Sequence, residues 1–391
     1  MSTIDIDRVR AETPGCEKII HFNNAGASLP PEPVYRAVTR HLALERRIGG
    51  YEAEERARDL LEGFYTSFAG LLHCDPREIA YVENATRAWD MLFYSVPLRK
   101  GDVILTSRAE YVSNYLAFLH RGRRCGAVVE VVPDDETGQV SLEAMEKMID
   151  ARVKLIALTH VPTQGGLVNP AADVGKIARK HGILYLLDAC QSVGQIPLDV
   201  EAVGCDMLSG TGRKFLRGPR GTGYLYVRRS LIDKLDPPFI DLHSATWIDG
   251  GSYEIRKDAR RFENWESYVA GRVGLAAAVD YAMAVGIGNI CRRVKALARS
   301  LRERLAEIPG VAVCDLGVEK SGIVTFVKNG ESANAIRRRL NARRMNVSVV
   351  KSNSALLDME PRGLKELVRA SVHYYNTEDE IERFCRELAS A

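Results

Sequence analysis

Short apolar segments alternate with longer segments of helical periodicity through the first two thirds of the chain. Residues 183–187 read Ile-Leu-Tyr-Leu-Leu and lack the polar alternation of a half-buried strand. Such strands fit a sheet covered by helices on both faces, so the pattern predicts an α/β fold built from parallel βαβ units. The clearest predicted strands are residues 103–106, 127–132, 155–159 and 184–187, and the predicted helices between them are residues 85–94, 111–121, 142–149 and 171–180.

The pattern changes near Arg256. We therefore expect a large domain over residues 17–255 and a smaller domain formed by residues 1–16 and 256–391. The elements predicted after the boundary are helices over residues 267–285, 290–308 and 332–343, a strand over residues 322–327 and a final helix after Asn376.

The charge balance gives no reason to expect nucleic acid or an anionic membrane as a partner. The 391 residues include 54 Lys and Arg and 51 Asp and Glu, a formal charge of +3. No apolar run is long enough to cross a bilayer, and residues 1–15 lack the apolar core of a signal peptide, so we expect a cytoplasmic protein. The eight cysteines contain no CxxC pair, and no metal site is predicted.

Asp188 ends the most apolar predicted strand, where open α/β sheets place their ligands. A carboxylate at that position is removed from water and needs a partner. Either it caps the residues that follow, or it contacts a bound cofactor. The sequence around Asp188 does not decide between these two interpretations.

The segment over residues 208–223 favours the cofactor. It places Lys214 in a glycine-rich turn between two strands, beside Thr211 and Arg213. A buried lysine loses hydration, its pKa falls, and the neutral amine becomes a nucleophile toward an aldehyde. The hydroxyl and the guanidinium beside it suit a phosphate. Together with Asp188 as a partner for a basic ring nitrogen, these residues match an aldehyde cofactor that carries a phosphate.

Four stretches of sequence extend this match to nearly the whole chain: His-Phe-Asn-Asn-Ala-Gly-Ala-Ser at residues 21–28, residues 188–195, residues 209–227 and residues 367–377. Together they resemble the fold type I pyridoxal-phosphate enzymes of the class V aminotransferase family, which includes cysteine desulfurases, kynureninase, isopenicillin N epimerase-like and hercynylcysteine sulfoxide lyase-like proteins. The resemblance implies a large, mainly parallel seven-stranded domain, a smaller α+β C-terminal domain, a small amino acid substrate and a homodimer with shared active sites.

The resemblance also implies a role for each matching residue. Lys214 would hold pyridoxal 5'-phosphate through a Schiff base and move the α proton of the substrate. Asp188 would keep the pyridine nitrogen protonated, which makes the ring an electron sink. The backbone amides of Ala85 and Thr86 would open a helix and bind the phosphate.

Other positions would surround the cofactor ring. Tyr111 falls where desulfurases carry a ring-stacking histidine, and a tyrosine can stack there but relays protons poorly at neutral pH. Gln191 and Thr163 would approach the phenolic oxygen. For the nearby His160 we favour a structural role.

Substrate binding is assigned to a second group of residues. Arg369 lies in a strand-like run and matches the arginine that binds the substrate α-carboxylate through a two-pronged contact. Asn24 and Ala25 belong to a loop whose backbone would approach the same carboxylate.

Two departures from the family pattern bear on the reaction. Residues 349–356 contain no cysteine where desulfurases carry their nucleophile, so we expect an enzyme other than a cysteine-relay desulfurase. Trp265 and Glu266 stand where many relatives have a small Gly-Thr pair. With His243 they would shape a pocket for a larger or cationic side chain, and dimer packing is the alternative for Trp265.

The predicted function is removal of the α proton of an amino acid followed by β-elimination, of the carbon–sulfur lyase type. Amino transfer and epimerisation are the alternatives within the family, because they begin with the same proton removal. A non-catalytic cofactor sensor is disfavoured, since the sequence shows no attached DNA-binding segment.

Overall fold

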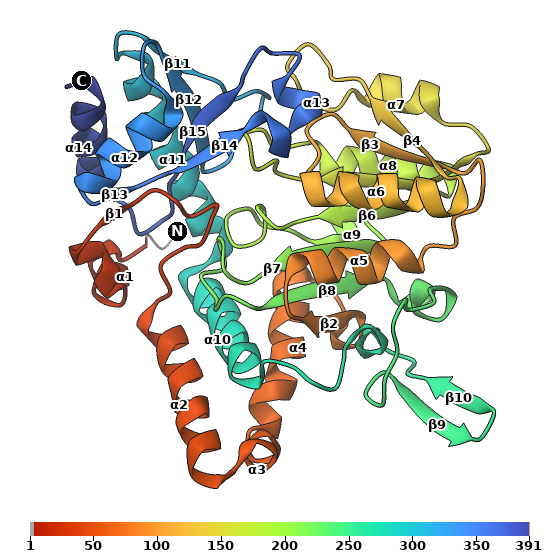
Figure 1. The fold of residues 1–391 in the computed structure, drawn as a ribbon. Helices are drawn as coiled ribbons and strands as arrows, with labels where there is room; N and C mark the ends of the chain where they lie inside the picture. Colours follow the sequence, from red (N-terminus) through yellow and green to blue (C-terminus); the bar gives the residue numbers. More distant parts are fainter. Residues whose placement is uncertain (1–3, 391) are drawn as a thin grey trace.

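A seven-stranded sheet forms the centre of the molecule (Figure 1). The computed structural model describes residues 4–390. The strand order is β2-β8-β7-β6-β5-β3-β4; β8 runs antiparallel to both neighbours and the other adjacent strands are parallel, which confirms the predicted fold class. The strands are β2 Ile79–Val82, β3 Val103–Ser107, β4 Val128–Val132, β5 Val153–Thr159, β6 Leu184–Asp188, β7 Met207–Thr211 and β8 Gly223–Val227.

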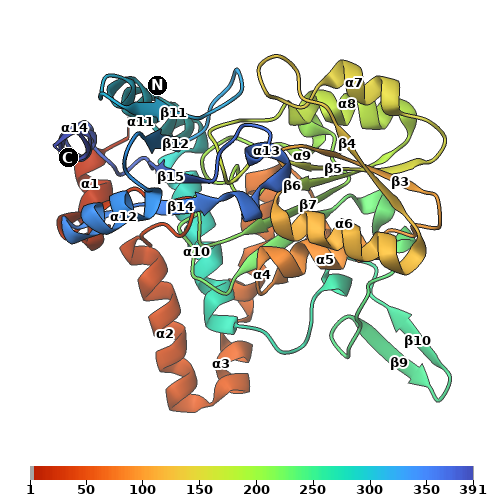
Figure 2. The ribbon, with the colours of Figure 1, turned by 45° about the horizontal axis from the view of Figure 1, so that its top comes forward.

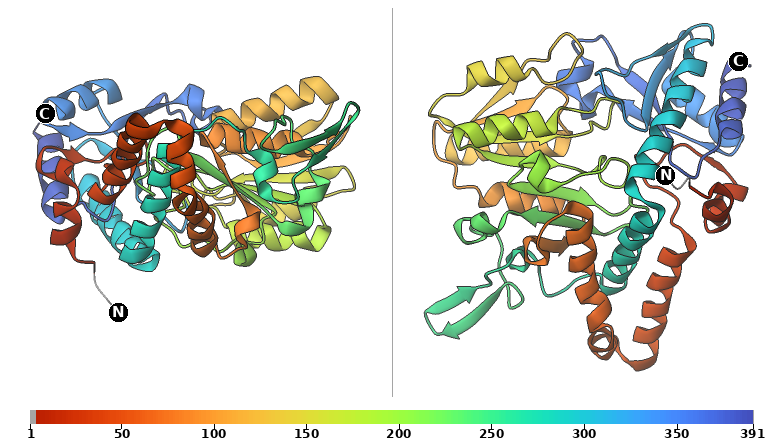
Figure 3. Two further views of the ribbon diagram at one scale, coloured as in Figure 1. Left: turned by 90° about the horizontal axis from the view of Figure 1, so that it is seen from below. Right: turned by 180° about the vertical axis from the view of Figure 1, so that it is seen from behind.

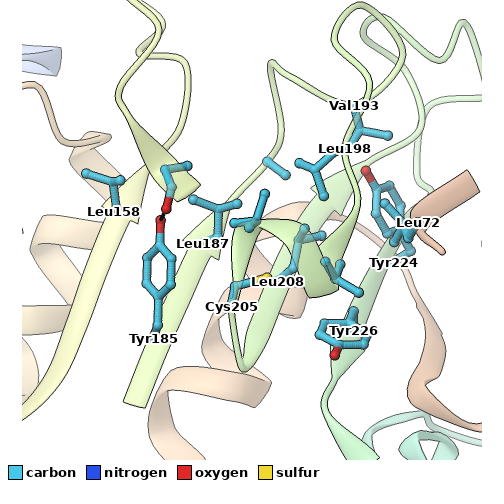
Figure 4. Packing of buried hydrophobic residues seen from close by; sticks show 14 of the residues in the cluster. Leu72, Leu158, Tyr185, Leu187, Val193, Leu198, Cys205, Leu208, Tyr224 and Tyr226 are labelled. Atoms are coloured by element: carbon cyan, nitrogen blue, oxygen red, sulfur yellow. Dashed lines mark hydrogen bonds between the residues drawn. The ribbon is translucent and has the colours of Figure 1, made fainter. Parts of the chain in front are cut away.

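Helices cover both faces of this sheet, as the apolar strands require. One face packs on α5 and α6, and the other packs on α4, α7, α8 and α10. Tyr185 lies in the second of these cores, where its hydroxyl donates to the Ala171 carbonyl over 3.1 Å (Figure 4). The helices are α4 Arg58–Leu72, α5 Ala85–Ser95, α6 Val112–Cys125, α7 Leu142–Met148, α8 Ala171–His181, α9 Val200–Val203 and α10 Val269–Val285.

A second, antiparallel sheet has the strand order β11-β12-β15-β14 and its own apolar core. The helices α11, α12 and α14 contribute side chains to this core. The domain boundary near residue 256 stays a prediction. Residues 1–3 and 391, which the prediction assigns to the smaller domain, lie outside the described residues. The elements of this part are α1 Ile6–Ala11, β1 Ile20–His21, α11 Ile287–Ala306, β11 Val311–Val313, β12 Ile323–Lys328, α12 Ala333–Ala342, β13 Met345–Asn346, β14 Ser348–Lys351, α13 Leu356–Met359, β15 Glu366–Ser371 and α14 Glu378–Ala389.

Two arms extend from the large sheet (Figures 2 and 3). One is a helical arm of α2 Glu32–Ile48, α3 Gly50–Arg56 and α4, and α10 packs against it. The other is the hairpin of β9 Ala245–Asp249 and β10 Ser252–Ile255. Within residues 4–390, no single helix is long and apolar enough to cross a membrane, and α10 and α11 meet that test only together, across a bend of 78°.

Candidate active site

The carboxyl ends of β5, β6 and β7 meet the first turns of α5 and α6 at one edge of the large sheet, and a cavity opens there. Every residue predicted to contact the cofactor lines this cavity; their individual roles stay predictions. The lining residues are Asn84, Ala85, Thr86, Tyr111, Asn114, Thr159, Val161, Thr163, Asp188, Cys190, Gln191, Thr211, Arg213, Lys214 and Gly221.

Asp188 is the last residue of β6 and is buried. Its Oδ1 accepts from the Cys190 backbone N–H over 2.9 Å, and its Oδ2 accepts from Asn114 Nδ2 over 2.9 Å. The first contact fixes a turn after the strand and does not cap a helix. Among the described residues no lysine, arginine or histidine forms an ion pair with Asp188. Its charge is therefore available to a bound cation or a protonated ring.

Lys214 is buried in the turn after β7. Hydrogen bonds hold this turn: Gly218 N–H donates to the Gly212 carbonyl over 2.8 Å, and Arg217 N–H donates to the Lys214 carbonyl over 2.9 Å. Burial lowers the pKa of the Lys214 amine, the Asp188 charge opposes that shift, and the Arg213 charge adds to it. The neutral, nucleophilic form of the Lys214 amine is therefore more accessible than it is for an exposed lysine.

The first turn of α5 faces the same cavity through Ala85 and Thr86. Asn84 caps this helix: its side chain accepts from Arg87 N–H over 2.9 Å. A β-carbon added to Gly223 would lie 2.7 Å from the Asn84 carbonyl carbon, so only glycine lets β8 approach the helix start this closely. The unpaired amides and the dipole of such a helix start suit a phosphate.

Arg369 lies on β15 and is joined to the cavity wall through Thr163. Its Nη1 donates to the Thr163 carbonyl over 3.1 Å and to the Thr163 hydroxyl, and its Nε donates to Ser348 Oγ over 2.9 Å. Burial lowers the pKa of Arg369 to about 10, and the nearby positive charge of Arg213 contributes to the same shift. No carboxylate of the described residues pairs with this guanidinium, so it is available to a substrate anion.

The loop that contains Asn24 and Ala25 lies beside this cavity, since the Ala25 carbonyl accepts from Gln191 Nε2 over 3.1 Å. Arg213 also reaches the loop and donates to the Gly26 carbonyl. The Asn24 side chain, however, is fully buried and donates to the Ser371 carbonyl over 2.7 Å. A contact from this loop to the substrate would therefore come from its backbone.

The structure does not bring Trp265, Glu266 and His243 into the first cavity. They line a second cavity with Glu263, whose buried carboxylate lies 3.0 Å from His243 Nε2. Trp265 is half exposed, and its ring lies 6.4 Å from that of Tyr51. The substrate-binding role given to these three residues stays a prediction.

Sequence reasoning missed several residues that line the first cavity or support Asp188, among them Glu110, Asn114, Thr159 and Cys190. The spacing of Glu110 and Asn114, four residues apart at the predicted start of α6, was available in the sequence. Glu110 lies just before the helix N-cap Tyr111 and Asn114 lies in the first turn, where their side chains meet over 2.9 Å. Thr159, the last residue of β5, would have been found by the same rule that selected Asp188.

The residues of the cavity fit pyridoxal 5'-phosphate. Lys214 supplies an amine of lowered pKa, and α5 supplies a helix start for a phosphate. Gln191 Oε1 is buried and has no hydrogen-bond partner among the described residues. The guanidinium groups of Arg213 and Arg369 lie at the site, which suits a ligand with a phosphate and a substrate with a carboxylate.

Comparisons with known proteins agree with this fit. The family model described as aminotransferase class-V matches residues 20–384. A probable cysteine desulfurase of Xylella fastidiosa strain 9a5c is 32% identical over 401 residues, covering 98% of this chain and 95% of that protein. The apo structure of a cysteine desulfurase from Thermococcus onnurineus NA1 superposes with a TM-score of 0.93 at 27% identity and covers 100% of this chain and 98% of that chain. A C-DES mutant with glycine covalently linked to the PLP cofactor shares the fold, with a TM-score of 0.88 at 22% identity over 97% of this chain and 98% of that chain.

These relatives correct one sequence-based conclusion. The missing cysteine in residues 349–356 was taken to exclude a cysteine-relay desulfurase, and that exclusion is wrong, because relatives matching nearly the whole chain are named cysteine desulfurases. One loop position says little against a match in sequence and fold over nearly the whole chain, and it does not show where a sulfur acceptor must lie. The chain belongs to the class V aminotransferase family and is an enzyme that uses pyridoxal 5'-phosphate.

Proposed function

We propose that the enzyme removes the α proton of a sulfur-containing α-amino acid and then cleaves its carbon–sulfur bond by β-elimination. One observation carries the proposal: the Lys214 amine and the Asp188 carboxylate line one cavity, and Arg369 is bonded to its wall through Thr163. The names of the relatives, cysteine desulfurases, support cysteine-type substrates.

Each group has a distinct task in this proposal. Arg369 binds the α-carboxylate through its guanidinium, whose Nη2 forms no hydrogen bond with the described residues, and so orients the amino acid. Lys214 accepts the proton from Cα through its neutral Nζ, which its burial favours. The first turn of α5 holds the phosphate through Ala85 and Thr86, with Thr211 and Arg213 assigned beside it, while Tyr111, Thr163 and Gln191 surround the ring.

Asp188 is assigned to the pyridine nitrogen, where a fixed carboxylate stabilises a proton. When bound, pyridoxal 5'-phosphate withdraws electrons from Cα of the attached amino acid and thereby acidifies its C–H bond. Loss of a thiol from the β-carbon then gives pyruvate and ammonia after hydrolysis. Burial of Lys214 and Asp188 keeps bulk water from competing for the proton.

A product assay tests the proposal. The purified enzyme is incubated with cysteine, cystine and cysteine conjugates, with and without an added 2-oxo acid. We expect pyruvate and ammonia in equal amounts, independent of the 2-oxo acid. Formation of alanine would indicate desulfuration and would contradict elimination. Conversion of the added 2-oxo acid would indicate amino transfer, and loss of optical activity alone would indicate epimerisation.

Two further inferences concern the setting of the enzyme. We infer a homodimer, because several large apolar side chains are exposed near the second cavity and on the β9–β10 hairpin, among them Trp247, Trp265 and Leu242. We infer a reducing, cytoplasmic location, because all eight cysteines are free thiols. Light scattering on the purified protein measures the first, and fractionation of the source cells measures the second.

A further inference from the structure

A hydrogen-bonded chain of three side chains leads away from Asp188 into the protein. Asn114 Nδ2 donates to Asp188 Oδ2 over 2.9 Å and also to Glu110 Oε1 over 2.9 Å. All three residues are buried, and the sequence predicted no role that links them. One side-chain amide therefore joins two buried carboxyl groups.

The chemistry of an amide fixes the orientation of Asn114. Its nitrogen carries two hydrogens, and the two carboxyl oxygens receive one each. A flipped amide would point its oxygen at both Asp188 and Glu110 and lose both bonds. Glu110 thus holds Asn114 in the orientation that presents an N–H to Asp188.

Glu110 is itself held from several elements. Its Oε1 accepts from the Tyr111 backbone N–H over 2.7 Å, and its Oε2 accepts from Thr106 Oγ1 on β3 over 2.9 Å. Thr159 on β5 also donates to Oε1. These donors leave the carboxyl group no freedom to turn, so its position relative to Asn114 is fixed.

Glu110 faces a negative charge and has no positive partner among the described residues. Asp188 on β6 is the charged group that faces it across Asn114, while β3, β5 and α6 present hydroxyl, amide and backbone groups. No cation of the described residues forms an ion pair with Glu110. Burial raises the pKa of Glu110 to about 7; the hydrogen bonds from Thr159 and Asn114 lower it, and the Asp188 charge raises it. Part of the Glu110 population is therefore ionised at neutral pH, and the ionised fraction grows as the pH rises.

We propose that Glu110 is a positioning residue for Asp188: through Asn114 it orients the Asp188 carboxylate, and its negative charge strengthens the hold of that carboxylate on a proton at the pyridine nitrogen of the cofactor. The inference rests on the proposed assignment of Asp188 to that nitrogen. In this proposal Glu110 influences protonation of the cofactor ring without contacting the cofactor.

The test reads the ring proton directly. The holoenzyme is prepared with pyridoxal 5'-phosphate labelled with ¹⁵N in the ring, and the ¹⁵N chemical shift is followed against pH. Removing a nearby negative charge weakens proton binding, so in Glu110→Gln we expect proton affinity to fall about tenfold, a midpoint lower by about one pH unit. Ser107→Ala is the matched control, because it removes a buried β3 hydroxyl that has no hydrogen-bond partner among the described residues and leaves every Glu110 and Asn114 contact in place; we expect its midpoint to stay within about 0.3 unit of wild type.

A second variant covers the case in which Glu110→Gln does not fold. Asn114→Leu keeps the Glu110 carboxyl group and cuts its link to Asp188, and we expect its midpoint to fall as well. A wild-type midpoint in Asn114→Leu, or in a folded Glu110→Gln protein, would overturn the inference. Asp188→Asn separates this failure from that of the proposed function: an unchanged midpoint in Asp188→Asn would show that Asp188 does not face the ring nitrogen at all.

Discussion

The two neighbouring cavities differ in how their side chains are held. Around Lys214, the polar groups come from strand ends and first helical turns, and Asp188 is fixed by two hydrogen bonds of 2.9 Å. Around Trp265, the residues come mostly from the long connection between β8 and α10, and Trp265 itself is 50% exposed. Strand ends and a first helical turn position Thr159, Asp188 and Asn114 in the first cavity, whereas the Trp265 side chain of the second cavity is half exposed. We therefore expect substitutions in the first cavity to affect chemistry and those in the second to affect substrate preference.

The largest effect is expected from Lys214→Ala. It removes both the group that attaches the cofactor and the group that accepts the α proton, so kcat/KM should fall by about 10³-fold or more. Lys154→Ala, an exposed lysine on β5, is the control and should behave as wild type. Steady-state kinetics on the best amino acid measure both. A loss below about tenfold would remove Lys214 from the chemistry.

Asp188→Asn should come next. The amide cannot stabilise a ring proton by charge, and loss of such a preorganised partner costs about 3 kcal/mol or more, a rate loss of about a hundredfold. Deuterium exchange at Cα of a bound amino acid measures the step without reference to the product. Exchange at the wild-type rate in a variant that retains cofactor would show that this carboxylate has no part in it.

Arg369→Lys should affect substrate binding while leaving the cofactor spectrum unchanged. A lysine supplies a point charge in place of the planar guanidinium, so the activation free energy for kcat/KM with amino acids should rise by about 2 to 4 kcal/mol. Amines without a carboxylate are the control, because their slow reaction does not use the contact. If amines and amino acids slowed equally, or if cofactor were released, Arg369 would have a structural or phosphate-binding role instead.

Trp265→Ala is expected to give the smallest effect. It should raise the activation free energy for kcat/KM by about 1 kcal/mol or less and change the ranking of substrates with different side chains. A panel of cysteine conjugates of increasing size measures that ranking. An effect as large as that of Arg369→Lys on every substrate would place Trp265 in the main site and end the distinction between the two cavities.

The sequence predicted the parts of the fold that follow from local pattern. The strand over residues 155–159 and the helix over residues 171–180 agree with β5 and α8 to within two residues, because apolar runs and helical periodicity mark such elements. The β9–β10 hairpin was missed, since its residues are largely exposed and carry no core pattern.

The same limit applies to the site. Asp188 and Lys214 were found because each is a charged side chain in an apolar or glycine-rich setting, which local sequence displays. The link from Glu110 through Asn114 joins α6 to β6 across 74 residues of chain, and only the parallel packing of β3, β5 and β6 brings the two ends together. Contacts between residues so far apart in the chain depend on the fold topology, so a local sequence pattern does not predict them.

Identification of the lysine that carries the cofactor tests whether Lys214 forms the Schiff base. The yellow holoenzyme is reduced with borohydride, digested, and the pyridoxyl-modified peptide is sequenced by mass spectrometry. We expect a single modified peptide with the label on Lys214, between Gly212 and Gly218 in the turn after β7. A label on any other lysine, or no stable label with cofactor bound, would contradict it.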